Sequence, residues 1–248
     1  MKKLMILLAL TCLAAGGCVQ MQMDTVIEAD GSGTLTMSYA MSPSVAEALA
    51  ELSEIPGNEA GDAPTMDDFD VKKIREACQN HGCKLKKFEM KDDQTGVSFE
   101  IAFPSLQALS EALSEGGTGD SGMGGFALYR LADGNYAIDS YEPKSRPADE
   151  EAETEEEMDM EEAMAEMDPE AMQKSMAVMG KLMGSMGELD IRMSMTVPGD
   201  FVKQNAHRVE GRTAIWEINS SNMMDPSAQA EPEIVFSGAG LKIKALEK

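Results

Sequence analysis

The sequence predicts an α+β fold with a mostly antiparallel sheet, intercalated helices and an acidic, Met-rich helical insertion. Three observations support this prediction. Extended segments recur in pairs around Gly- or Asp-containing turns, which is typical of β-hairpins. Short helical patterns lie between these pairs without a regular βαβ alternation. A strongly acidic run followed by a methionine-rich helical pattern interrupts the strands at residues 142–187.

Residues 1–17 have the features of a lipoprotein signal peptide. Lys2 and Lys3 are followed by an apolar run at 4–15, which at about a dozen residues is shorter than the roughly 20 that a membrane-spanning helix needs. Small residues then lead directly to Cys18, and this arrangement resembles the lipobox of bacterial lipoproteins, whose cysteine becomes the first mature residue and receives acyl chains. We therefore predict that Cys18 is lipidated. The alternative is a secreted protein in which Cys18 merely follows the cleavage site.

The predicted location is the cell envelope, with the chain attached to a membrane through Cys18. Two or three acyl chains on one residue anchor stably, since each buried methylene contributes about 0.8 kcal/mol. Val19, and not an aspartate, follows the cysteine, which favours the outer membrane, facing the periplasm, in a diderm organism. No later stretch is apolar enough to span a bilayer, so we expect the remainder of the chain to lie in water.

The charge balance limits the partners. The chain has 44 acidic and 21 basic residues, for a net charge of −23, and removal of Lys2 and Lys3 with the leader leaves 19 basic residues and −25. A surface this acidic repels phosphate backbones, so nucleic-acid binding is excluded from the expected functions. It also disfavours a surface that clings to anionic lipid head groups.

Residues 18–141 are predicted to form the N-terminal part of the domain. The apolar residues at 97, 99, 101 and 103 alternate with polar ones, so one face of that strand should be buried. Helices are expected at 44–52, 67–80 and 104–114, with capping residues before the first and third. The hairpin strands are expected at 25–29 with 34–39, 84–90 with 96–103, and 126–131 with 136–140.

Residues 142–168 form an acidic low-complexity segment in which ten of the fourteen residues from 149 to 162 are Asp or Glu. Like-charge runs of this kind repel themselves and are usually solvated. Residues 169–187 then predict an amphipathic helix. Its methionines share one stripe and are Met172, Met176, Met179, Met183 and Met186. Residues 188–248 supply the last strands of the same domain, expected at 189–197, 207–209, 212–218 and 233–246.

The methionines, 22 in all, leave three interpretations open. A Met stripe can be core packing, because the flexible thioether fills irregular gaps, or an exposed adaptable surface for apolar ligands and partner helices. Thioethers also bind Cu(I), so a periplasmic Met-rich copper-binding protein is a third possibility.

Cys78 and Cys83 are an even pair in a chain predicted to be exported, which predicts a disulfide between them. His81 lies between the two cysteines, but a zinc site normally adds a second ligand pair elsewhere. We therefore predict no metal site and no cofactor.

The sequence contains no catalytic motif: Gly-x-Ser-x-Gly, Walker-type loops and His-Glu-x-x-His are all missing. Acidic pairs could serve a glycosidase, but sugar clefts are usually lined by aromatic residues and this chain has few. We expect no enzymatic activity.

Two blocks at the ends of the mature chain resemble the LppM-like domain of bacterial lipoproteins. The first is 26–35, VIEADGSGTL. The second runs from 195 to 218 and contains MTVPGDFV, an Asn-Ala pair and VEGRTAIWEI. The resemblance implies an α+β domain of the cell envelope with a role in binding lipids or other envelope components, and it offers no catalytic residues to carry over.

The sequence as a whole predicts a lipid-anchored, non-catalytic envelope lipoprotein that binds a lipid, another apolar ligand or an envelope protein. Trp216 and the Met stripe are the candidates for an apolar contact surface, although Trp216 also fits a core position. The first alternative is a structural or interaction module without a ligand pocket. The second is the copper-binding protein named above.

Overall fold

The computed structural model describes residues 19–53, 69–91, 95–117, 125–141, 173–178, 180–181, 189–225 and 231–247. The predicted signal peptide, Cys18 and the acidic segment lie outside these residues, as does most of the methionine-rich helix.

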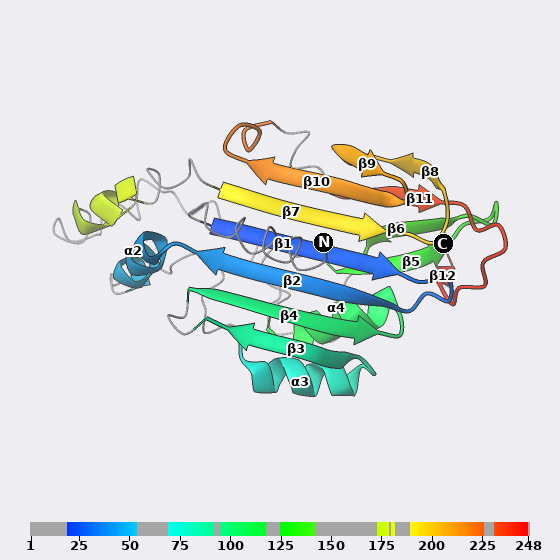
Figure 1. Cartoon of the computed structure of the whole chain (residues 1–248), viewed down its shortest axis with the longest axis horizontal. Helices are drawn as coiled ribbons and strands as arrows, with labels where there is room; N and C mark the ends of the chain where they lie inside the picture. The colour runs from blue at the N-terminus through cyan, green and yellow to red at the C-terminus, as the bar shows by residue number, and fades with distance from the viewer. Residues whose placement is uncertain are drawn as a thin grey trace, which may run out of the picture.

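A large sheet runs through the molecule, and the first strand of the described chain lies near its middle (Figure 1). Its strands in spatial order are β3 (Lys84–Met90), β4 (Gly96–Phe103), β2 (Gly33–Met41), β1 (Val19–Ile27), β7 (Leu189–Thr196), β10 (Thr213–Asn219) and β9 (Arg208–Glu210). All neighbours are antiparallel except β1 and β7, which run parallel with Val19 opposite Leu189.

A smaller sheet lies beside one end of the large one (Figure 1). Its strands in spatial order are β12 (Leu246–Glu247), β5 (Phe126–Arg130), β6 (Tyr136–Ser140), β11 (Ile234–Phe236) and β8 (Phe201–Gln204). The short β12 pairs with β5 in parallel, and the other pairs are antiparallel.

The described residues include the helices α2, α3 and α4 and a short helical stretch at 173–178. α2 (Pro43–Ser53) follows β2 directly, and the Ser42 hydroxyl accepts the Val45 N–H at its start. α3 (Val71–Asn80) begins at the N-cap Asp70, and α4 (Leu106–Glu115) begins at Ser105, so side-chain caps satisfy free N–H groups at all three starts. α3 packs against α4 and β3, at the edge of the large sheet.

The core is a single buried cluster that joins both sheets with α3 and α4. Cross-strand partners share a face of the sheet, so the register assigns whole rows to one side. One such row contains Met23, Met37 and Phe99, which are all buried. The row next to it contains Gln22, Ser38 and Ser98, which belong to the opposite, outer face.

The predicted α+β class is confirmed, and the hairpin of β3 and β4 has its expected bounds. Three features differ from the prediction. The strands form two sheets, each with one parallel pair. β1 begins at Val19, six residues before the expected strand at 25, because its Val, Met and Gln residues alternate and pair with β2 and β7 over that whole length. The strand β8 was not predicted.

Candidate functional site at the start of β1

A groove of about 750 Å³ crosses the end of the large sheet where β1 begins. Residues of β1, β2, β3, β4 and β7 line it, together with Lys91 just beyond β3. The side chains of two neighbouring outer-face rows make up most of its polar lining. They include Gln20, Gln22, Ser38, Ser98, Asp190 and Arg192.

Charges of both signs line this groove. Arg192 and Lys91 are the cations, and Glu89 and Asp190 are the anions. The Nε atom of Arg192 is buried and has no hydrogen-bond partner among the described residues. A buried donor without a partner costs about 1–3 kcal/mol, so a bound acceptor that reached this atom would recover that free energy.

Gly96 makes room for the second cation. A Cβ atom on this glycine would lie 3.0 Å from both Cδ and Cε of Lys91, so the aliphatic stem of Lys91 lies directly over the glycine backbone. The groove therefore offers positively charged hydrogen-bond donors and negatively charged hydrogen-bond acceptors. Apolar side chains, among them Met21 and Met90, complete the lining.

Cys18 lies outside the described residues, but its neighbour Val19 is the first residue of β1. Val19 is paired on both sides, with Met41 of β2 and Leu189 of β7. A group attached to Cys18 is thus joined to the middle of the large sheet without a linker, at the end that carries the groove.

Cys78 and Cys83 are buried free thiols, and the predicted disulfide is not present. The end of α3 explains the spacing. Gly82 adopts a φ of 71°, its N–H donates to the Gln79 carbonyl at 3.2 Å, and the Cys83 N–H donates to the Cys78 carbonyl at 2.7 Å. This is a Schellman motif, in which the residues in the positions of Cys78 and Cys83 commonly make an apolar contact. Both thiols belong to the core cluster as small apolar groups.

His81 forms an ion-pair geometry with Glu115, and its Nε2 lies 2.7 Å from Oε2 of that carboxylate. Asn80 donates to the other Glu115 oxygen at 2.6 Å. The hydrogen bond from Asn80, followed by that from His81, lowers the pKa of Glu115 below its usual value. Within the described residues no group of three or more His, Cys, Asp or Glu side chains could hold a metal ion.

Trp216 is 4% exposed and lies in the core, so its assignment to an apolar contact surface was wrong. It shares a sheet row with the buried Met23 and Met37, and its indole N–H donates to the Asn205 side-chain oxygen at 3.2 Å. The alternation of β10 places Trp216 on the inner face of the sheet.

Of the methionine stripe, only Met176 is described. It lies in the helical residues 173–178 and is 60% exposed, whereas Val178 is 1% exposed on the other side of the helix. Lys181 holds this segment to α2 through an ion pair of 2.7 Å with Glu51. Met172, Met179, Met183 and Met186 lie outside the described residues, so the three interpretations of the stripe as a whole stay predictions.

The groove residues were not among the predicted site residues. The alternation of Gln20, Gln22 and Asp24 with Met21 and Met23 is the signal that could have found the β1 part. It indicates a strand with one polar face. The contribution of β7 depends on a pairing between residues about 170 positions apart, which leaves no local mark in the sequence.

The fold and this groove define the chain as a two-sheet α+β domain with a groove of mixed polar and apolar lining at one end of its large sheet. No family model and no curated protein matches the chain. Among solved structures, it is similar to the NMR structure of the folded domain of the LppM protein of Mycobacterium tuberculosis. That comparison covers 90% of this chain and 91% of the other at 10% identity, with a TM-score of 0.41. No helix among the described residues is long and apolar enough to cross a membrane.

Proposed function

We propose that this chain is a bacterial envelope lipoprotein, anchored by acyl chains on Cys18, whose folded domain binds the polar head of an envelope lipid in the groove at the start of β1. One observation carries the proposal. β1 begins one residue after Cys18, and the groove opens at that same end of the sheet. An acylated Cys18 therefore brings the groove to the surface of the bilayer.

The charged residues that line the groove favour binding of the polar part of the lipid. Arg192 supplies a buried donor that suits a phosphate oxygen, and Lys91 adds a second positive charge. Glu89 and Asp190 supply acceptors for an amine or hydroxyl on the same molecule. We propose binding and not catalysis as the role of this groove, with a head group that carries both a phosphate and a hydrogen-bond donor as the ligand.

The anchor is tested by metabolic labelling. Radiolabelled palmitate should enter the wild-type chain and be absent from Cys18→Ala. Mass spectrometry of the mature N-terminus should show an acylated cysteine as residue 18. Equal labelling of both chains, or a wild-type protein released into the medium without acyl groups, would contradict the lipoprotein assignment.

The groove is tested by lipid binding to the full chain. Dihexanoyl phosphatidylethanolamine, a short-chain phospholipid whose head group has both charges, should bind the wild type in native mass spectrometry and in titration calorimetry. Arg192→Gln should raise its Kd about tenfold or more, because a hydrogen bond to a charged group contributes about 1.5–3 kcal/mol.

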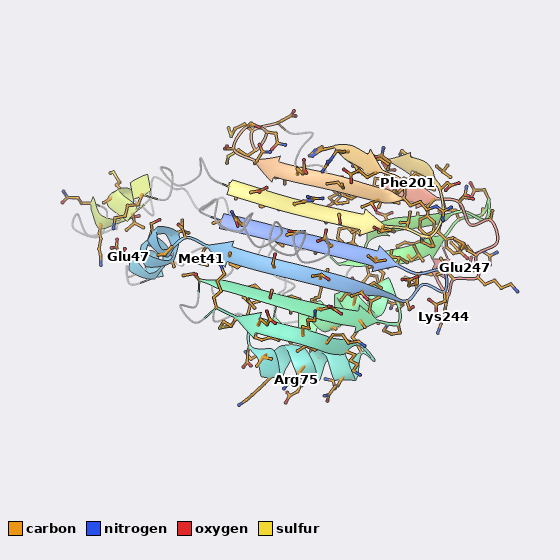
Figure 2. The ribbon with its side chains drawn as sticks, viewed as in Figure 1. Met41, Glu47, Arg75, Phe201, Lys244 and Glu247 are labelled. Carbon is orange, nitrogen blue, oxygen red and sulfur yellow. The ribbon has the colours of Figure 1, made fainter. Side chains whose placement is uncertain are left out.

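Arg75→Gln is the matched control for this experiment. Arg75 is an exposed arginine of α3 at the edge of the large sheet (Figure 2), and it does not line the groove. Its substitution should leave the Kd unchanged. Failure of the wild type to bind, or equal losses in both variants, would remove the groove as the ligand site and favour an interaction module.

A further inference from the structure

Val19, the first residue of β1, leaves no room for a flexible tether between Cys18 and the large sheet. Consecutive Cα atoms are about 3.8 Å apart, so Val19 lies one such step from Cys18. The polar layer on each side of a bilayer is only about 5–8 Å thick. With the acyl chains of Cys18 in the hydrocarbon, the end of the sheet that contains Val19 must lie at the level of the head groups.

Exposed large apolar side chains occur at both ends of the large sheet, and those at the end that contains Val19 are methionines. Six are exposed in the described part of the chain: Met90, Met176, Met224, Val26, Val202 and Val209. The three methionines lie at the end where β1 begins, and the three valines lie toward the opposite end. The exposed methionines and the exposed valines are therefore separated along the direction of β1.

The register places two of the methionines. Met90, 38% exposed, pairs with Val97, and that row continues through Tyr39 to Met21 near the start of β1. Met224, 86% exposed, follows the last residue of β10, Asn219, which pairs with Asp190 at the start of β7. Turn hydrogen bonds within residues 219–225 keep Met224 close to that strand end.

The third methionine is placed by α2. This helix follows Met41, which pairs with Val19, and Figure 2 shows Met41 and Glu47 at the same end of the sheet. The Lys181–Glu51 ion pair fixes the helical residues around Met176 to α2. Val178 is buried, so this short helix packs by one side and presents Met176 to the outside.

We infer that this end of the large sheet rests directly on the membrane surface, with β1 steep to the bilayer and with Met90, Met176 and Met224 inserted among the lipid head groups. The inference rests on the proposed lipidation of Cys18. Methionine suits this role, because its flexible thioether adapts to an irregular apolar environment. The net charge of −25 without Lys2 and Lys3 leaves anionic lipids without an attractive role, so the contact depends on apolar insertion.

This orientation differs measurably from its alternative. β1 spans nine residues, so its two ends are about 27 Å apart at about 3.4 Å per residue, several times the depth of the head-group layer. An upright sheet keeps its far end in water and leaves the groove open to neighbouring head groups. A sheet lying on its outer face would instead bring Val26 to the bilayer.

The test uses acylated full-length protein in phosphatidylcholine vesicles, with an environment-sensitive fluorophore on a single introduced cysteine. Met224→Cys and Met90→Cys report on the anchored end, and Val202→Cys and Val26→Cys are the matched probes of the far end. Cys78 and Cys83 are buried and resist labelling in the folded protein. A lipid with a nitroxide at its head group serves as the quencher.

The upright orientation predicts a blue shift and quenching for the probes at 224 and 90, and no change at 202 and 26. Quenching at 26, or no quenching at any of the four positions, would overturn it. The mass of the acylated N-terminus separates this result from the proposed function. A chain without acyl groups removes the anchor itself, whereas an acylated chain with an unquenched probe at 224 removes only the orientation.

Discussion

The two faces of the large sheet are built from the same strands and differ in almost every property. On the inner face, Met37 and Phe99 are opposite one another and buried. One residue further along, Ser38 and Ser98 are opposite one another on the outer face and line a groove. The period of two in a strand thus separates the residues that hold the fold together from those that are available to a ligand.

The comparison of the two faces predicts which substitutions each face tolerates. Inner-face residues are packed from several directions, so a change in volume there costs free energy of unfolding. Outer-face residues of the groove such as Gln22 and Ser38 are exposed, so we expect substitutions there to have little effect on stability. Function and fold can therefore be varied independently on one sheet, and the following predictions test that separation.

The largest effect is expected for Phe99→Ala. Phe99 is 2% exposed, and its ring lies 6.4 Å from that of Phe69. Its truncation should lower the free energy of unfolding by about 3–5 kcal/mol in urea titrations followed by circular dichroism. The neighbouring Ser98→Ala should change it by no more than about 0.5 kcal/mol. Comparable losses in the two variants would mean that the outer face also stabilises the fold.

A second effect is expected where backbones approach closely. A Cβ atom on Gly33 would lie 2.0 Å from the Val26 carbonyl oxygen and 2.5 Å from Cζ of Phe103. Gly33→Ala should therefore cost about 1–3 kcal/mol, because the hairpin backbone and a buried ring must both move. Gly180→Ala is the control, since nothing lies within 4 Å of its Cβ position. The measurement is the same urea titration, and an unchanged midpoint for Gly33→Ala would show that the hairpin relaxes freely.

Much of this fold follows from local signals in the sequence. The β3–β4 hairpin was predicted to the residue, because four apolar residues of β4 alternate on one face and a polar turn separates the strands. α3 and α4 were predicted within four residues at each end, because Ser105 and the glycines that follow both helices mark three of the four boundaries, whereas the N-cap Asp70 was missed. The division into two sheets was missed, because β8 and β12 are short and pair only with distant partners.

The candidate site was less accessible to sequence reasoning. Trp216 was named as a candidate for a contact surface although a core position was the favoured interpretation, and the register and its 4% exposure place it inside. The groove residues Gln22 and Arg192 meet across the parallel pair of β1 and β7. No local sequence pattern predicts the pairing of β1 with β7, since the two strands are separated by most of the chain.

The third prediction concerns the buried cysteines Cys78 and Cys83. Burial raises the pKa of Cys78 and raises that of Cys83 to about 12, the latter with a further contribution from the adjacent Cys78. The Cys83 thiol should thus be alkylated at pH 8 at least about a thousandfold more slowly in the folded than in the unfolded protein, since the thiolate is the nucleophile.

Replacement of the same side chain should have a modest cost. Cys83→Ala should lower the free energy of unfolding by about 1 kcal/mol through lost packing, equally with and without reductant. A wild type whose stability falls by about 2–5 kcal/mol on reduction would instead have a structural disulfide. Alkylation followed by mass spectrometry of the denatured, unreduced protein gives an independent count of free thiols.

The smallest effect is expected at Glu115, the last residue of α4, which contacts Asn80 and His81 at the end of α3. Its pKa is lowered by the hydrogen bond from Asn80, then by that from His81, so the ionised form is favoured in the folded state. A group with a lowered pKa stabilises the fold above its unfolded pKa, and this contribution disappears as the pH falls through its folded pKa. Glu115→Gln should cost less than about 1 kcal/mol at pH 7, because the carboxylate is exposed and screened. The difference from wild type should vanish in acid, where both side chains are neutral. Urea midpoints at pH 7 and at pH 3 test this, and a difference that grows toward low pH would reverse the assigned sign.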